Sequence, residues 1–403
     1  MRIAALTAAL MGAAMMAQAN AADIHSISRI EFGPAGVLFV ADWRASRIEA
    51  IQLPAAPAAT ASPYNIYDLH KLLSNAIGGS EVRVTDMKVR PGTGLVYVAY
   101  EFGPNGTPAL AQVNSQGEVK RIDLRAAAAT EIVLKNATTA NVAFWGKVPE
   151  RSMTVTDMRW HGNELFVAGL SNQSFASSLW RLRYPFDGNS SLTSIEMFHT
   201  THNQVETRAP IRAMTFATLN GMPSLVAAYM CSPLVTIPID TLRDGAHVRG
   251  KTVAEMGFGN TPSDIVSFNS GTTTNILVTN FERSAALMSV SAVADADSRP
   301  SMNQFVPFGQ IQGIQYEPLP LAGAVRIDNL DDKYVVVLRN NIEWNKTQLV
   351  TYDKSYFLRV SDYVQEYAFP GYTYPPGFQT NVIEPIENTL MKEEGYTSEY
   401  TTY

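Results

Sequence analysis

A two-strand pattern returns six times along this chain of 403 residues, and it constrains the fold more than any other feature of the sequence. Each copy is a short apolar strand, a turn of Gly, Asn or Pro, and a second apolar strand that ends in a polar loop. Regular repetition over a whole chain is typical of a repeat architecture. The copies begin at Ser28 (SRIEFGPAGVLFVADWRASRIEAI), Thr85 (TDMKVRPGTGLVYVAY), Thr156 (TDMRWHGNELFVAGL), Arg212 (RAMTFATLNGMPSLVAAYM), Ser263 (SDIVSFNSGTTTNILVTNF) and Ala324 (AVRIDNLDDKYVVVLRN).

The length of the repeat indicates which architecture this is. Successive copies begin 51 to 71 residues apart, which is enough for four strands and their turns. The sequence therefore predicts an all-β fold, a single β-propeller of six four-stranded antiparallel blades, in which the copies form the first two strands of successive blades. Seven blades would result if residues 121–150 or the C-terminal tail added strands. A β-sandwich is also built from short strands, but it has no reason to repeat one pattern six times.

The phrase GPAGVLFVADWRASRIEAI in the first copy resembles a blade of the NHL, gluconolactonase-like and quinoprotein propellers. The resemblance extends over residues 28–352 as a repeat pattern, and it implies the architecture. These families include lactone hydrolases, sugar dehydrogenases and binding scaffolds, so the fold alone selects none of them. We expect a propeller that binds a ligand, metal or protein partner at one face. The alternative is an enzyme, either a lactonase-like metal-dependent hydrolase or a quinoprotein-type dehydrogenase.

The two ends of the chain differ from the repeats. Residues 1–21 combine one Arg, an Ala-rich apolar run and small residues near the end, as in a signal peptide. We therefore expect an exported protein, periplasmic or secreted, with the propeller over residues 22–370. Residues 371–403 form a Tyr- and Pro-rich acidic tail that we expect to be extended or disordered and removable. The segment VQEYAF from Val364 is a candidate outer strand that closes the ring.

Charge and hydropathy exclude two kinds of partner. The net charge is -6, 17% of the residues are charged, and Lys and Arg do not cluster, so nucleic acid is not an expected partner. No second apolar run of about 18 residues follows the first, so no membrane span is expected. The expected partner is a small-molecule or protein ligand at one face of the disc.

The chemistry-bearing residues concentrate in the segment that holds the single cysteine, Cys231. In an antiparallel blade, the first strand starts and the second strand ends on the same face. The loop with His199, His202 and Glu206 should therefore lie beside Cys231. Imidazole, thiolate and carboxylate donors suit copper or zinc. The alternatives are solvated histidines and an inert, buried thiol.

Three aspartates form a second candidate site, because Asp86, Asp157 and Asp264 begin three of the copies and should converge on the propeller axis. They could hold a divalent cation such as calcium, or they could accept hydrogen bonds from the neighbouring blade. Arg29 and Arg212, near the same rim, could pair with these acids or hold an anionic ligand or cofactor. Arg208, in the loop that carries His199, is a third candidate for cofactor binding.

Overall fold

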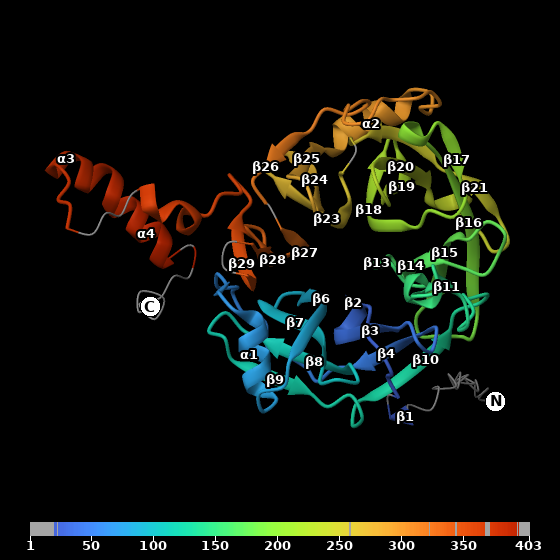
Figure 1. Cartoon of the computed structure of the whole chain (residues 1–403), viewed down its shortest axis with the longest axis horizontal. Helices are drawn as coiled ribbons and strands as arrows, with labels where there is room; N and C mark the ends of the chain where they lie inside the picture. The colour runs from blue at the N-terminus through green and yellow to red at the C-terminus, as the bar shows by residue number, and fades with distance from the viewer. Residues whose placement is uncertain are drawn as a thin grey trace, which may run out of the picture.

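Six sheets, each built on four antiparallel strands, stand around a central axis, so the prediction of a six-bladed β-propeller is confirmed (Figure 1). The computed structural model describes residues 20–21, 23–257, 259–321, 323–342, 345–366, 371–392 and 394. The first strand of each repeat is the innermost strand of one blade, and we number the blades 1 to 6 in this order. These strands are β2 (Arg29–Phe32), β6 (Val82–Arg90), β13 (Asp157–His161), β18 (Ile211–Leu219), β23 (Pro262–Ser270) and β27 (Ala324–Asn329).

Three further strands complete each blade toward its outer edge. They are β3 (Val37–Asp42), β4 (Arg47–Gln52) and β10 (Ala128–Val133) in blade 1; β7 (Leu95–Phe102), β8 (Thr107–Val113) and β9 (Val119–Ile122) in blade 2; and β14 (Glu164–Leu170), β15 (Ser177–Arg183) and β16 (Ser190–His199) in blade 3. They are β19 (Met222–Tyr229), β20 (Pro233–Pro238) and β22 (Lys251–Glu255) in blade 4; β24 (Thr273–Asn280), β25 (Ala285–Ser289) and β26 (Glu317–Leu319) in blade 5; and β28 (Tyr334–Asn341), β29 (Lys346–Asp353) and β5 (Asn65–Ile66) in blade 6. The short strands β1 (Asn20–Ala21), β17 (Gln204–Glu206) and β21 (His247–Arg249) extend blades 1 and 3.

The hydrophobic core lies between neighbouring blades. All six residues of β3 are buried, because a blade covers its neighbours with both faces of its sheet. This explains why the second strand of each repeat is a continuous apolar run rather than an alternating one. In the part of the chain that the structure describes, six apolar clusters fill the six gaps between blades.

The blades do not follow their sequence order around the ring. Figure 1 shows β6 between β2 and β27, so blade 2 is inserted between blades 1 and 6. The core agrees, since Phe39 of blade 1 shares a cluster with Met158 of blade 3, whereas Met87 of blade 2 shares one with Val336 of blade 6. The six patterns do form the first two strands of the blades. The expectation that they form successive blades is wrong, because the order around the ring is 1, 3, 4, 5, 6, 2.

The chain reaches this order by leaving blade 1 unfinished. After β4, residues 53–64 run to the outer edge of blade 6, where Ile66 of β5 pairs with Leu349 of β29. Helix α1 (Leu69–Ala76), whose N-terminus is capped by the Asp68 side chain, then leads into blade 2. Only afterwards does β10 pair with β4 and complete blade 1. Blades 1 and 6 are therefore each closed by a strand from a distant part of the sequence.

Neither segment that could have added a seventh blade does so. Residues 121–150 supply the end of β9, β10 and a small hairpin of β11 (Ala143–Phe144) and β12 (Val148–Pro149). The prediction of a closing strand from Val364 is wrong in its described part, because Val360–Glu366 forms a 3-10 helix and β5 occupies the outer edge of blade 6. Residues 367–370 lie outside the described residues.

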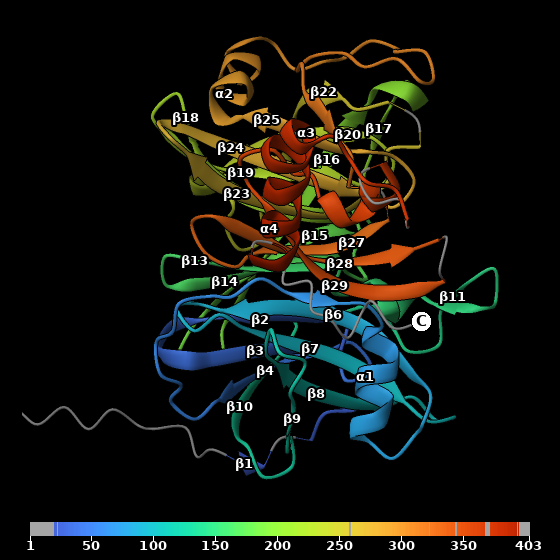
Figure 2. The ribbon, with the colours of Figure 1, turned by 90° about the vertical axis from the view of Figure 1, so that its left-hand side faces the viewer.

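The tail is helical rather than extended. Its elements are α3 (Pro376–Phe378), a π-helical turn (Gln379–Ile383) and α4 (Glu384–Lys392), which lie outside the ring (Figures 1 and 2). Past α4, the Glu394 carboxylate accepts hydrogen bonds from the Ser361 amide (3.1 Å) and hydroxyl (2.7 Å) and lies 3.7 Å from the Arg359 guanidinium. Helical structure therefore arises where the composition suggested none, and the Glu394 contacts anchor the end of the segment to the ring.

The N-terminal prediction cannot be compared over most of its length. Residues 1–19 of the predicted signal peptide lie outside the described residues, and Asn20–Ala21 form β1 beside β10. Within the described ranges, no helix combines the length and apolarity that a bilayer crossing requires.

Candidate functional site

The histidines and the cysteine meet where blade 3 borders blade 4. His199 ends β16, and a 3-10 turn (Thr200–His202) leads on to β17, which carries Glu206. Cys231 comes from the turn between β19 and β20 of blade 4. One donor atom from each of His199, His202 and Cys231 lies within 4.8 Å of the other two. The structure therefore brings together the residues that the strand directions predicted, whereas the role of these residues stays a prediction.

Glu206 holds both imidazoles by the same ring nitrogen. Its Oε1 lies 3.0 Å from Nδ1 of His199 and also contacts Nδ1 of His202. The two rings are tilted against each other, with their centroids 3.9 Å apart. Nε2 of His199 faces the neutral hydroxyl groups of Thr201 (3.0 Å) and Ser232 (3.3 Å). The carboxylate thus fixes the orientation of both rings and leaves Nε2 as the ring nitrogen directed away from it.

Burial and hydrogen bonding shift the pKa values of His199 and Glu206 in opposite directions. Burial alone lowers the pKa of His199, but interactions with Cys231 and Glu206 outweigh burial and raise this pKa to about 9. Burial raises the pKa of Glu206, and the hydrogen bonds from His199 and His202 outweigh this effect and hold it at about 2. His199 is 1% exposed and the side chain of His202 is 42% exposed, so the cluster reaches from the interior to solvent.

Cys231 has an uncommon backbone conformation. Its φ is 77°, in the left-handed region that non-glycine residues rarely adopt. Cys231 is intermediate in exposure, so it is not the fully buried cysteine that the sequence offered as an alternative. Strained backbone of this kind persists where the surrounding structure holds it, often at functional sites.

The three predicted arginines do not join this cluster. Arg208 is mostly exposed and lies 3.3 Å from the Glu150 carboxylate. The Arg212 guanidinium lies over the Phe281 ring, with its carbon 5.9 Å from the ring centroid. Arg29 donates to the carbonyl of Thr156 (2.7 Å). A role for them in binding an anion or cofactor stays a prediction.

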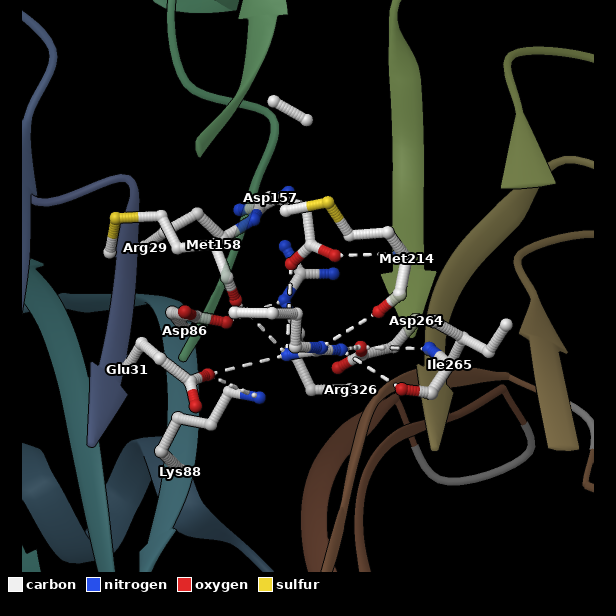
Figure 3. A network of polar contacts seen from close by, with 12 residues as sticks. Arg29, Glu31, Asp86, Lys88, Asp157, Met158, Met214, Asp264, Ile265 and Arg326 are labelled. Carbon is white, nitrogen blue, oxygen red and sulfur yellow. Dashed lines mark hydrogen bonds and ion pairs between the residues drawn. The ribbon is translucent and has the colours of Figure 1, made fainter. Parts of the chain in front are cut away.

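The three aspartates lie on the propeller axis and join adjacent blades (Figure 3). Oδ2 of Asp86 accepts from the Ile30 amide (2.8 Å), and Oδ2 of Asp157 accepts from the Met214 amide (2.8 Å). Asp264 accepts in the same way from the Ile327 amide (3.2 Å). Each carboxylate therefore connects its blade to the next one in the same sense around the ring, which is the hydrogen-bonding alternative for these residues. Cation binding by them stays untested.

Sequence reasoning missed the basic residues that neutralise this axis. Nε of Arg326 lies 2.7 Å from Asp86, and Nη2 of Arg159 lies 2.5 Å from Asp264. Nζ of Lys88 lies 3.1 Å from Glu31. The signal was available, because side chains two residues apart on a strand point to the same side. Glu31, Lys88 and Arg159 each follow by two residues the axial side chains Arg29, Asp86 and Asp157.

Burial governs the ionisation of these acids. It raises the pKa of Asp157, whose nearest Arg159 nitrogen is 3.7 Å away. Burial also raises the pKa of Asp264, but the closer contact with Arg159 outweighs this effect and holds it at about 2. The axis is therefore filled by paired side chains in which opposite charges compensate for the loss of solvent.

Comparison with known proteins finds no matching family and only distant structural similarity. No protein-family description and no curated protein sequence matches the chain. Similar solved structures include the PQQ-bound form of aldose sugar dehydrogenase from Streptomyces coelicolor (8% identity, 83% of this chain and 95% of that chain, TM-score 0.34). Another is the dihydro-haem d1 dehydrogenase NirN in complex with DHE (10% identity, 81% and 54%, TM-score 0.29), of which the chain therefore spans about half. A third is the hydrazine synthase of Kuenenia stuttgartiensis (11% identity, 89% and 84%, TM-score 0.35). Identities and TM-scores this low carry no argument about activity or cofactor. The six blades in the structure of the chain itself make it a six-bladed β-propeller.

Proposed function

We propose that this chain is an exported propeller that binds one transition-metal ion, zinc or copper, through His199, His202 and Cys231. The observation that carries the proposal is the position of Glu206, which contacts Nδ1 of both histidines. A carboxylate on the second ring nitrogen is the usual outer partner of a metal-bound histidine, because it fixes the ring and makes the ligating nitrogen more basic. Both Nε2 atoms then serve as ligands beside the thiolate.

The donor set fits such an ion. Two imidazoles and one thiolate are ligands of zinc and of copper, and harder ions such as calcium prefer oxygen. Ligand atoms around such an ion lie about 3.5 Å apart. The three donors here lie within 4.8 Å of one another, so binding of the ion would draw them together by about 1 Å and would replace the contacts of His199 Nε2 with the hydroxyl groups of Thr201 and Ser232. The half-exposed His202 leaves one side open to solvent or to a further ligand.

Metal analysis of protein purified from the periplasm without an added affinity tag tests the proposal. We expect about one equivalent of zinc or copper, and a thiolate-to-metal absorption band after replacement by cobalt or copper. Cys231→Ser and His202→Ala should lose the band and bind the metal at least tenfold more weakly. His161→Ala is the matched control. This exposed histidine ends β13, which runs opposite to β16, so it lies on the other face of blade 3 from His199. Binding that is unchanged in Cys231→Ser, or lost equally in His161→Ala, contradicts the proposal.

A second candidate function rests on a different observation, the left-handed backbone of Cys231 beside a histidine that is held by a carboxylate. In this arrangement Cys231 is a nucleophile, His199 takes its proton and Glu206 orients the imidazole. The two candidates differ in their need for His202. If the thiol acts alone with His199, iodoacetamide should label Cys231 equally fast in wild type and in His202→Ala, and zinc should protect neither. If the metal site is correct, zinc should protect wild type and leave His202→Ala reactive.

The axis gives less support to the enzyme predicted from the resemblance, in which a cation or quinone would bind the central carboxylates. Asp86 and Asp264 each have one oxygen on a backbone amide and the other beside an arginine. A cation would have to displace these partners. We therefore place the proposed function at the blade 3–4 border.

A further inference from the structure

A cavity of about 780 Å³ opens at the rim between blades 1 and 2, apart from the metal site. Its walls come from three stretches, the N-terminal segment 23–25 with Arg44, the turn 102–109 between β7 and β8, and the connection 121–125 that carries the chain from β9 to β10. These stretches meet because blade 2 is inserted next to blade 1 and β10 returns to complete blade 1. The volume lies within the range of small-molecule sites.

Three guanidinium groups line this cavity, those of Arg44, Arg121 and Arg125. Among the ion pairs of the described residues, none involves these three arginines, although arginines such as Arg47 and Arg181 do pair with carboxylates. The chain carries a net charge of -6, so three guanidinium groups without an acidic partner at one cavity are a local reversal of charge. Such a cluster raises the local concentration of anions.

Two acids also line the cavity, but both are engaged elsewhere. The Asp123 carboxylate accepts from the backbone amides of Arg125 (3.0 Å) and Ala126 (3.2 Å), which fixes the turn. The Asp23 side chain is mostly exposed and lies 3.7 Å from the His25 ring and 4.0 Å from Arg47. Both carboxylates keep their negative charge, so the three arginines outnumber the two acids of the lining and remain the groups able to bind an acidic ligand.

Aromatic rings and backbone atoms hold two of the arginines in place. The Arg121 guanidinium carbon lies 5.9 Å from the centroid of the Phe102 ring, and that of Arg44 lies 5.3 Å from the Trp43 ring. Nη1 of Arg44 also donates to the His25 carbonyl (3.3 Å). A Cβ added at Gly106 would lie 3.9 Å from Nη2 of Arg44, so this side chain reaches from blade 1 toward the turn of blade 2. Side chains that are oriented in advance lose less entropy when they bind.

Apolar surface accompanies these charges. Phe102, Ile122 and Leu124 are partly buried residues of the cavity wall. A ligand that carried charge alone would leave this surface in contact with water, whereas an organic skeleton would cover it. Guanidinium groups supplied by different segments of the chain also favour a ligand with acidic groups at more than one position.

We propose that this cavity binds an organic polyanion, a small molecule that carries at least two carboxylate, phosphate or sulfate groups on an apolar or ring-shaped skeleton. Arg44 binds one acidic group from the side of blade 1. Arg121 of β9 and Arg125 of the connection between β9 and β10 bind another. The proposal is independent of the metal site, because the two sites share no residue.

Calorimetric titration with three probes tests the proposal and distinguishes the acidic groups. The probes are benzene-1,3,5-tricarboxylate, glucose 1,6-bisphosphate and a disulfated disaccharide. At least one should bind with 1:1 stoichiometry at low salt. Its affinity should fall at least tenfold in Arg121→Gln and in Arg44→Gln. These arginines are exposed, so neither substitution should change the thermal midpoint.

Arg249→Gln is the matched control, because this exposed arginine lies on β21 in blade 3. Its affinity for the same probe should equal that of wild type. The proposal is overturned if none of the three probes binds. It is also overturned if Arg249→Gln weakens binding as much as Arg121→Gln does, which would indicate attraction to the overall charge.

Discussion

Replacing Asp86 by Ala should be among the most damaging single changes in this protein. Asp86 is 1% exposed, and its two oxygens serve different blades. One accepts from the Ile30 amide of blade 1 (2.8 Å), and the other pairs with Nε of Arg326 of blade 6 (2.7 Å). The substitution therefore affects both borders of the inserted blade 2.

The expected loss follows from these two contacts. Removing one member of a buried ion pair costs about 3–5 kcal/mol, because the remaining charge stays buried without a partner. An unsatisfied buried amide adds about 1–3 kcal/mol. Water that enters the vacated space offsets part of the sum, so we expect a loss of about 4–6 kcal/mol. At about 2 °C per kcal/mol for a domain of this size, the thermal midpoint should fall by roughly 8–12 °C.

Thermal unfolding followed by circular dichroism measures this shift. Asp295→Ala is the control, because Asp295 forms an exposed pair with Arg299 on α2 (Val290–Ser298) and should change the midpoint by no more than about 2 °C. The double substitution Asp86→Leu with Arg326→Met should recover a large part of the loss, since no charge is then left unpaired. A fall in Asp86→Ala no larger than in the control would refute the proposed role of the axial pairs.

Three further predictions concern the closure of the ring, the tail and the effect of pH. Cysteines placed at Asn65 and Val350, in a chain that lacks the native thiol, should form a disulfide under mild oxidation, because these residues are directly paired between β5 and β29. A pair that stays reduced in the folded protein would contradict the closure of blade 6 by β5. Deleting residues 371–403 should lower the midpoint by a few degrees through the loss of the Glu394 contacts and leave a folded ring, whereas a drop of more than about 10 °C would mean that the tail is part of the ring. Burial raises the pKa of Glu49 from 4.5 to about 7, so the stability that the protonated group contributes is complete below pH 4.5 and is lost as the pH rises through 7. Glu49→Gln should therefore reduce the fall in midpoint between pH 5 and pH 8, and equal falls in both proteins would contradict this.

The sequence predicts the units of this fold well because each unit carries its own signal. The apolar run VLFVAD and its counterparts must be buried on both faces, which only packing between blades provides, and the turns between paired strands are marked by Gly, Asn or Pro. The grouping of Cys231 with His199, His202 and Glu206 could be predicted for the same reason, since the direction of antiparallel strands decides where their ends lie.

The order of the blades could not be read in this way. Blades 1 and 2 expose similar apolar faces, and nothing in β2 or β6 states which neighbour each will have. The order depends on residues 53–64, which take the chain from blade 1 past the position of blade 2 to the outer edge of blade 6. It also depends on β5, a strand of two residues that is too short to give a sequence pattern. The axial ion pairs could not be predicted for a related reason. The interval of two residues places Lys88 and Arg159 on the axis, but the acids that they pair with, Glu31 and Asp264, belong to other blades, so no local pattern shows the pairs.

The insertion of blade 2 between blades 1 and 6 affects the rates at which the protein folds and unfolds. When β4 leaves the ribosome, blade 1 still lacks its outer strand, and β5 has no partner until β29 is synthesised near the end of the chain. Contacts between such distant segments slow folding, because a large loop must close before any of them forms. The same connections slow the reverse process, since blade 1 cannot separate without releasing β10 and blade 6 cannot separate without releasing β5. A protein built in this way should have a high barrier to unfolding, which lengthens its lifetime in the presence of proteases.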